Sequence, residues 1–94
     1  MAGPESKVQS RVIAILEARG FEVIKTIATN KRGVSDVIAC APNGTFWALE
    51  IKGSPKLPTP LQRLFLHRIK ERGGVSAVIW DASQIYALFS KYLP

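Results

Sequence analysis

Residues 33–52 read Gly-Val-Ser-Asp-Val-Ile-Ala-Cys-Ala-Pro-Asn-Gly-Thr-Phe-Trp-Ala-Leu-Glu-Ile-Lys, a pattern typical of a β-hairpin. Apolar and β-branched residues dominate its two arms, residues 34–40 and 46–52, as expected of strands. The segment between the arms, residues 41–45, contains the Pro-Asn-Gly sequence of a turn. We therefore expect two neighbouring antiparallel strands here.

The length of the turn sets which side chains face each other across the hairpin. If residues 42–44 form a three-residue loop with its glycine in the left-handed conformation, Ala41 pairs with Thr45. Asp36 then lies directly opposite Glu50. A two-residue Asn-Gly turn would shift the pairing by one residue and turn the Asp36 side chain to the other face of the sheet.

Further elements are indicated on both sides of the hairpin. A helix begins at Pro4, where proline is tolerated, and its apolar residues keep a helical spacing up to Gly20. A capping pattern, Thr59-x-x-Gln62, marks the start of a second helix. We expect this second helix to bury Leu61, Leu64, Phe65 and Ile69. The other expected elements are strands at residues 21–27 and 75–80 and a C-terminal helix that contains residues 85–92.

The resulting order, helix, three strands, helix, strand and helix, indicates one α/β domain over residues 1–94. No apolar run is long enough to span a membrane and no signal-peptide pattern is present, so we expect a cytoplasmic protein. The one cysteine, Cys40, excludes an internal disulfide and a cysteine-based zinc site. We expect it to be a small buried side chain.

The charge of the chain favours a polyanionic partner. Thirteen Lys and Arg residues against seven Asp and Glu residues give a formal charge of +6. Such a surface attracts nucleic acid, because each neutralised phosphate releases counterions. A solvated basic surface without specific contacts is the alternative. Five basic residues near the hairpin acids in sequence are candidates for DNA contacts: Lys25, Lys31, Arg32, Lys56 and Arg63.

The hairpin concentrates acidic residues at one place on the sheet. The two-residue period of a strand puts Glu50 and Lys52 on one face, and Asp36 would lie opposite Glu50. Like charges directly opposite each other destabilise a sheet, and a hard divalent cation such as Mg²⁺ or Mn²⁺ would offset that repulsion. In the alternative interpretation, Asp36 ends a turn and the other two are solvated surface residues.

Gly33-x-x-Asp36, then Glu50-x-Lys52, then Gln62 at the start of a helix, resembles the PD-(D/E)XK nuclease superfamily. More narrowly, the chain is similar to small, phage-type members of the VRR-NUC group, which also have a glutamate on the first helix, here Glu5. Ser35 stands where this superfamily often has proline. The resemblance implies a restriction-endonuclease-like αβββαβ core, with a mixed four-stranded sheet flanked by helices and a C-terminal helix.

The resemblance also implies roles for individual residues. Catalytic roles fall to Asp36, Glu50, Lys52 and Gln62. The expected ligands of Mg²⁺ or Mn²⁺ are Glu5, Asp36, Glu50 and the main-chain carbonyl of Ile51. Two of these residues have competing explanations, since Glu5 suits the first turn of a helix and Gln62 completes the capping box.

The implied activity is that of a metal-dependent, structure-selective DNA endonuclease. Small VRR-NUC proteins resemble dimeric enzymes that cleave four-way (Holliday) junctions, so we expect a homodimer acting on branched DNA in a bacterial or phage-infected cell. Two alternatives stay open: a flap- or restriction-type nuclease that acts with a partner, and a non-catalytic nucleic-acid-binding module on the same fold.

Overall fold

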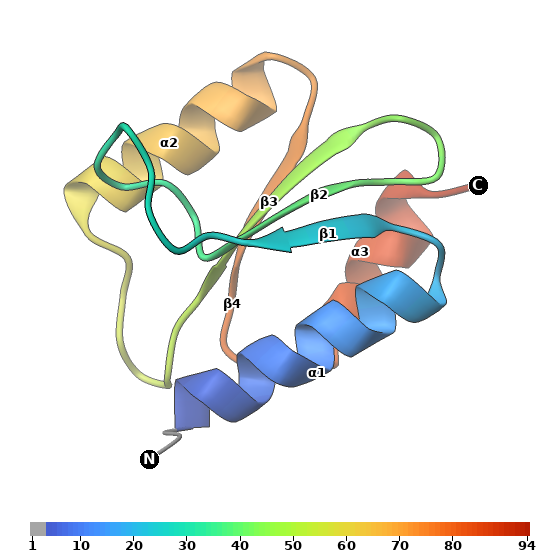
Figure 1. Cartoon of the computed structure of the whole chain (residues 1–94), viewed down its shortest axis with the longest axis horizontal. Coiled ribbons are helices and arrows are strands. Elements are labelled where there is room, and N and C mark those ends of the chain that lie inside the picture. The colour runs from blue at the N-terminus through green and yellow to red at the C-terminus, as the bar shows by residue number, and fades with distance from the viewer. Residues whose placement is uncertain (1–3) are drawn as a thin grey trace.

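The computed structural model describes residues 4–94 and contains a four-stranded sheet with three helices (Figure 1). The strand order is β1-β2-β3-β4, with antiparallel pairing of the first three strands and parallel pairing of β3 with β4. This confirms the predicted α/β fold with a mixed sheet. The elements are α1 (Pro4–Ala18), β1 (Glu22–Lys25), β2 (Val37–Cys40), β3 (Phe46–Ile51), α2 (Pro60–Glu71), β4 (Val75–Ile79) and α3 (Gln84–Tyr92).

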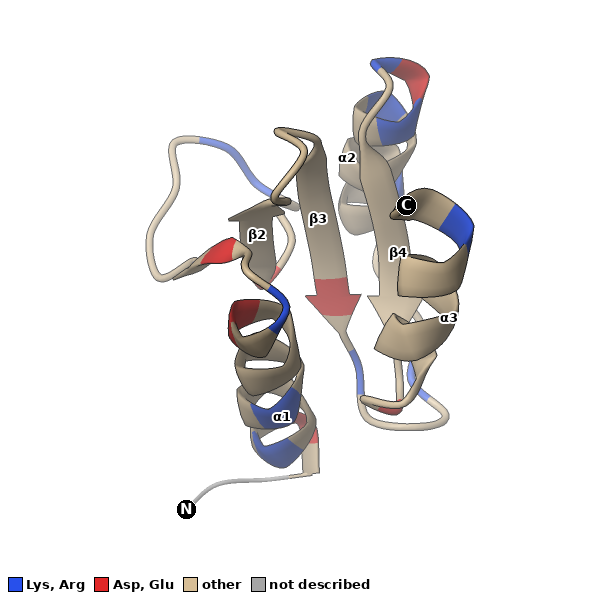
Figure 2. Ribbon diagram, turned by 90° about the vertical axis from the view of Figure 1, so that its right-hand side faces the viewer, with Lys and Arg blue, Asp and Glu red and all other residues tan. Residues whose placement is uncertain are grey.

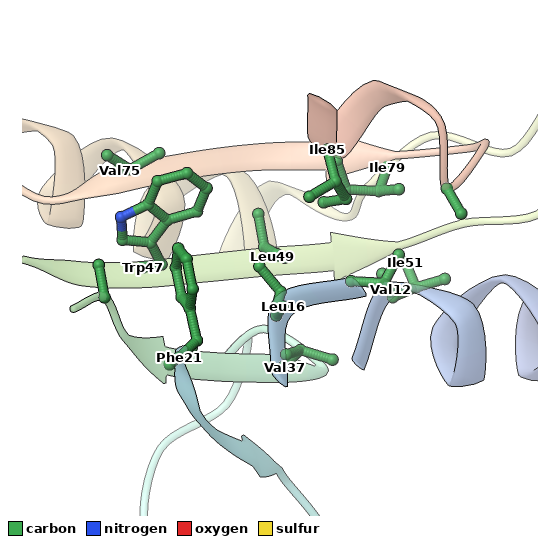
Figure 3. Close-up of a cluster of buried hydrophobic side chains, with 13 residues drawn as sticks. Val12, Leu16, Phe21, Val37, Trp47, Leu49, Ile51, Val75, Ile79 and Ile85 are labelled. Carbon is green, nitrogen blue, oxygen red and sulfur yellow. The ribbon is translucent and has the colours of Figure 1, made fainter. Parts of the chain in front are cut away.

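The helices cover the two faces of the sheet unequally. α1 and α3 pack beside each other on one face, whereas α2 packs against β3 and β4 on the other. The main core lies under α1 and α3, where Val12 and Leu16 meet the buried side chains of the strands (Figure 3). Trp47 is fully buried there, and its ring lies edge-on to that of Phe21 with the centroids 4.9 Å apart.

The β2–β3 hairpin has the predicted three-residue loop. Gly44 has a φ of +86°, and the Ala41 N–H donates to the Thr45 carbonyl at 2.9 Å. Val37 consequently pairs with Leu49, which is the register that brings Asp36 and Glu50 together. The alternative two-residue turn is excluded. β1 ends two residues before its predicted limit and β2 begins three residues after its predicted limit, while the other strand limits agree to within one residue.

The start of α2 is also as predicted. The Gln62 N–H donates to the Thr59 hydroxyl and the Thr59 N–H donates to Gln62 Oε1, which is a complete capping box. The predicted buried stripe, however, is only partly correct, because Phe65 and Ile69 are half-buried whereas its other two residues are exposed. Leu66 is the buried residue of the helix, while Leu61 and Leu64 are 47% and 41% exposed. α2 packs on the sheet through its Leu66 side, and its richer apolar side faces the loop between β1 and β2.

Cys40 is exposed rather than buried, contrary to prediction. It lies at the end of β2. Its neighbours Ala39 and Ala41 point into the main core, so Cys40 points to the opposite face, where α2 covers β3 and β4 but not β2. None of the helices within residues 4–94 combines the length and apolar character needed to cross a membrane.

Candidate active site

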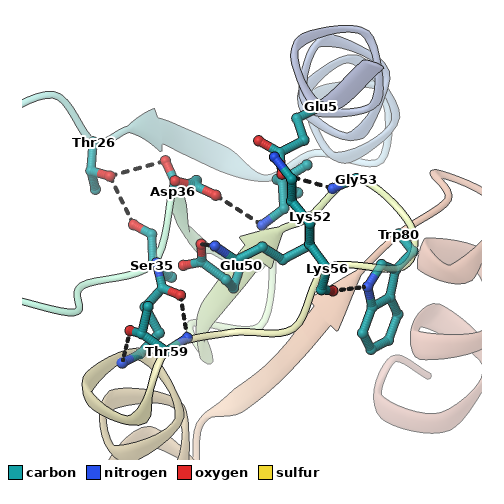
Figure 4. Close-up of polar contacts among 12 residues, drawn as sticks. Glu5, Thr26, Ser35, Asp36, Glu50, Lys52, Gly53, Lys56, Thr59 and Trp80 are labelled. Atoms are coloured by element: carbon teal, nitrogen blue, oxygen red, sulfur yellow. Dashed lines mark hydrogen bonds and ion pairs between the residues drawn. The ribbon is translucent and has the colours of Figure 1, made fainter. Parts of the chain in front are cut away.

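Two adjacent strands position a pair of carboxylates. Asp36 immediately precedes β2, and continuing the hairpin register by one step places it opposite Glu50 of β3. The Asp36 side chain also reaches across the ladder, where its Oδ2 accepts a hydrogen bond from the Ile51 N–H at 2.9 Å (Figure 4). The predicted pairing of the two acidic residues is therefore present in the structure.

Glu50 is an unusual carboxylate because it is almost completely removed from solvent. The residue is 1% exposed, and its Oε1 has no hydrogen-bond partner among residues 4–94. Burial, and after it the negative charge of Asp36, raises the pKa of Glu50 from 4.5 to about 8. The ammonium of Lys52 opposes this shift, since its Nζ lies 3.7 Å from Glu50 Oε2. Lys52 is thus on the predicted face.

The backbone that carries Asp36 is held by two hydroxyl groups. Thr26, just after β1, directs its Oγ1 at the Ser35 and Asp36 carbonyls at 2.8 and 3.1 Å, and its N–H donates to the Asp36 carbonyl. Ser35 is buried and donates from Oγ to the Val37 carbonyl. Thr26 could not be identified from the sequence, because the long loop between β1 and β2 leaves the register of that strand pair undetermined.

A glycine brings the same loop against α2. Gly33 has a φ of +80°, and a Cβ built on it would lie 2.6 Å from the backbone of Leu61. Glycine is required there for two reasons, the left-handed conformation and the close approach. Gly33 therefore determines how the loop that ends at Asp36 reaches the beginning of α2.

Glu5 lies near the site but has a hydrogen bond of its own. Its Oε1 accepts from the Gly53 N–H at 2.8 Å, one residue beyond Lys52. This contact links α1 to the loop after β3. The middle of the same loop is held by a 2.7 Å hydrogen bond that Trp80 Nε1 donates to the Lys56 carbonyl. The structure therefore gives Glu5 a contact that positions this loop.

The other sequence candidates fall into two groups. Gln62 stands at the first turn of α2 and uses its Oε1 in the capping box, which leaves its amide NH₂ as the group available for another contact. The five predicted DNA-contact residues are all on the surface, in or beside the loops that flank the carboxylate pair: Lys25, Lys31, Arg32, Lys56 and Arg63.

The donor set fits a divalent cation of the magnesium type. Residues 4–94 contain no cluster of three or more His, Cys, Asp or Glu side chains that could hold a metal ion. Asp36 and Glu50 therefore form a two-carboxylate site. Magnesium is commonly held by one or two carboxylates and keeps several waters. A buried carboxylate oxygen without a partner, beside a second carboxylate, is a group that such a cation would satisfy.

Comparison with known proteins supports the same family as the sequence motifs. No protein-family model and no curated protein matches the chain. A solved structure described as a VRR_NUC domain superposes with a TM-score of 0.83 and 28% sequence identity, covering 97% of this chain and 99% of the other. This likeness, together with Asp36 and Glu50 facing each other at neighbouring strands, supports the assignment of the chain to the VRR-NUC family, with a nuclease-type fold.

Proposed function

We propose that residues 1–94 act as a single nuclease domain that hydrolyses DNA phosphodiester bonds with the help of Mg²⁺ or Mn²⁺. The observation that carries this proposal is the Asp36–Glu50 pair, in which a buried carboxylate without a hydrogen-bond partner lies beside a second acid and a lysine. A buried acid beside a second acid destabilises a fold, and a bound cation would offset that cost.

Each residue has a distinct part in this proposal. Asp36, Glu50 and the Ile51 carbonyl would hold the cation, with Glu5 as a further ligand directly or through water. When bound, the cation supplies Lewis-acid polarisation of the scissile phosphate and makes water more acidic. Lys52 orients the attacking water and stabilises the negative charge that develops on the phosphate oxygens. Gln62 can donate its amide NH₂ to a phosphate oxygen while its Oε1 remains in the cap.

DNA is the substrate class that the surface favours. Lys and Arg are spread over α1, α2 and the loops, as Figure 2 shows, and the formal charge of the chain is +6. A non-catalytic binding module would gain nothing from two carboxylates beside bound phosphates, since they repel each other. The carboxylate pair therefore favours a nuclease over a binding module.

Branched DNA and a homodimer complete the proposal. Each copy of the chain supplies one Asp36–Glu50 pair, and one such site cuts one DNA strand at a time. Paired cuts on opposing strands of a four-way junction are simplest for two copies related by a two-fold axis. A flap- or restriction-type nuclease working with a partner would use the same chemistry. Cleavage assays on different DNA structures are therefore needed to distinguish these nucleases from a junction-cleaving enzyme.

The test is a cleavage panel with labelled four-way junction, flap and duplex DNA in Mg²⁺ and in Mn²⁺. We expect junction cleavage at paired positions, and a loss of about a hundredfold or more in Asp36→Asn, Glu50→Gln and Lys52→Ala. Glu17→Gln and Lys70→Ala, on exposed positions of α1 and α2, serve as matched charge controls. Cleavage that persists in the three site variants would overturn the assignment as a nuclease. Sedimentation tests the proposed homodimer, and a monomer at micromolar concentration would contradict it.

A further inference from the structure

A groove separate from the carboxylate pair lies between α2 and the loop that joins β1 to β2. Its volume is about 660 Å³, and it runs along α2 from Leu61 to Arg72, a length of about 16 Å at the rise of a helix. The groove is open because α2 packs on the sheet through Leu66 and turns its other apolar side toward the loop. Figure 1 shows this loop crossing in front of α2.

The rim of the groove is strongly positive. It carries four exposed basic residues, Lys31 and Arg32 from the loop and Arg68 and Arg72 from α2, and no acidic residue lines it. None of the four forms an ion pair within residues 4–94. The end of a helix accounts for a basic residue such as Arg68, but the loop has no such dipole to attract Lys31 and Arg32. Four unpaired cations around one groove are complementary to an anionic polymer.

The floor of the groove is apolar and partly open to solvent. Leu61 and Leu64 are 47% and 41% exposed, and Phe65 and Ile69 lie half-buried between them and the sheet. The paired bases of a duplex are stacked inside the helix, so a duplex offers such a floor little apolar surface. An unpaired strand offers both phosphates for the rim and base faces for the floor.

One end of the groove adjoins the candidate active site. Leu61 directly precedes Gln62, and Gly33, next to Arg32, packs against Leu61. The loop that forms one wall continues into Asp36. We propose that this groove binds a segment of single-stranded DNA and leads a strand that is unpaired at the branch point of the substrate to the carboxylate pair. The proposal rests on the proposed function for its choice of DNA.

The experiment measures binding in EDTA, so that cleavage plays no part. The probes are a fluorescein-labelled single strand of about 15 nucleotides and a blunt duplex of the same sequence. The double variant Arg32→Ala/Arg68→Ala should bind the single strand about tenfold or more weakly at 0.1 M salt, with a salt slope lower by about 1.4 for two lost phosphate contacts. Lys70→Ala is the control, because Lys70 lies on α2 outside the groove.

The floor has its own variant. Leu64→Gln changes an exposed residue, and it should weaken single-strand binding while leaving the salt slope unchanged, because it removes no charge. An equal loss of duplex and single-strand binding in Arg32→Ala/Arg68→Ala would overturn the inference, as would an effect no larger than that of Lys70→Ala. If the parent protein cleaves none of the DNA substrates but its single-strand binding depends on Arg32 and Arg68 as expected, only the proposed function is overturned. If cleavage behaves as expected but single-strand binding does not depend on these residues, only the groove inference is overturned.

Discussion

Asp36 and Ile51 are joined across the β2–β3 ladder, the backbone N–H of Ile51 donating to Asp36 Oδ2 at 2.9 Å. This bond uses one oxygen of Asp36 to fix the carboxyl group beside Glu50, whose Oε1 is buried without a partner among the described residues. The fold therefore holds two acids together at a cost in stability, which makes stability and activity respond oppositely to their removal.

Asp36→Asn should make the metal-free protein more stable while it removes cleavage. The amide oxygen can still accept the Ile51 N–H, whereas the negative charge beside Glu50 is lost. We expect the free energy of unfolding in EDTA to rise by roughly 1 kcal/mol at pH 9, where Glu50 is ionised and is repelled by Asp36. Urea denaturation measures this, with Glu17→Gln as the control for removing an exposed charge. A variant less stable than the parent would show that the two acids do not oppose each other.

The stability of the metal-free protein should fall as the pH rises from about 4.5 to about 8. In this range the unfolded chain releases the Glu50 proton, whereas the folded protein retains it because the pKa of Glu50 is raised to about 8. Rising pH therefore favours the unfolded state, and the loss of stability levels off above pH 8, at a total on the order of 5 kcal/mol. Thermal melts of the parent and of Glu50→Gln in EDTA should diverge in this window. Identical pH profiles would rule out the shift.

Gly33→Ala should be much more harmful than Gly73→Ala. Both glycines have φ near +80° to +90°, but a Cβ at Gly33 would meet the Leu61 backbone at 2.6 Å, whereas one at Gly73 would meet nothing within 4 Å. The left-handed conformation alone costs alanine about 1–2 kcal/mol. The extra loss in Gly33→Ala, measured by denaturant unfolding, reports the close approach of the loop to α2. Equal losses would show that the loop yields without resistance.

Thr26→Val should lower the rate of cleavage while it reduces the free energy of unfolding only modestly. The substitution keeps the shape of the side chain and removes the hydroxyl that is directed at the Ser35 and Asp36 carbonyls. We expect about 1 kcal/mol of lost stability and a lower kcat with little change in KM, because Asp36 is held less firmly. Thr45→Val, in the hairpin, is the control. A change confined to KM would contradict a positioning role.

Gln62→Glu distinguishes the role of Gln62 in capping α2 from its proposed role in the active site. A glutamate retains the oxygen that accepts from the Thr59 N–H, and a negative charge suits the start of a helix, so stability should be kept. The amide NH₂ is lost, so cleavage should fall at least about tenfold if it meets a phosphate. Thr59→Ala provides the opposite pattern, with a weakened cap and an intact Gln62 amide. Full activity in Gln62→Glu would show that Gln62 caps the helix and has no role in cleavage.

Local chemistry explains why part of the site could be predicted from sequence. The Pro-Asn-Gly loop with Gly44 sets the hairpin register, and that register alone brings Asp36 opposite Glu50. The Thr59 capping box is likewise a contact between near neighbours in the chain. Contacts of this kind depend on a few consecutive residues, so pattern and turn chemistry suffice to predict them.

The features that the sequence did not reveal depend on contacts between distant segments. Leu61 and Leu64 were assigned to the core because helical spacing identifies an apolar side but not the surface that it meets. Thr26 directly follows β1, whose partner strand β2 comes only after a long loop, so its position beside Asp36 could not be derived by counting residues along the chain. The Glu5 hydrogen bond to Gly53 joins residues 48 positions apart.

The three-residue turn at residues 42–44 has a consequence for how this chain can vary. Surface turns usually accept insertions and deletions more readily than the strands that they connect. Here one added or deleted residue would shift the hairpin by one step and direct Asp36 toward the interior occupied by Val37 and Leu49. The length of an exposed turn is therefore as restricted in this molecule as the identity of the carboxylates, although no residue of the turn touches them.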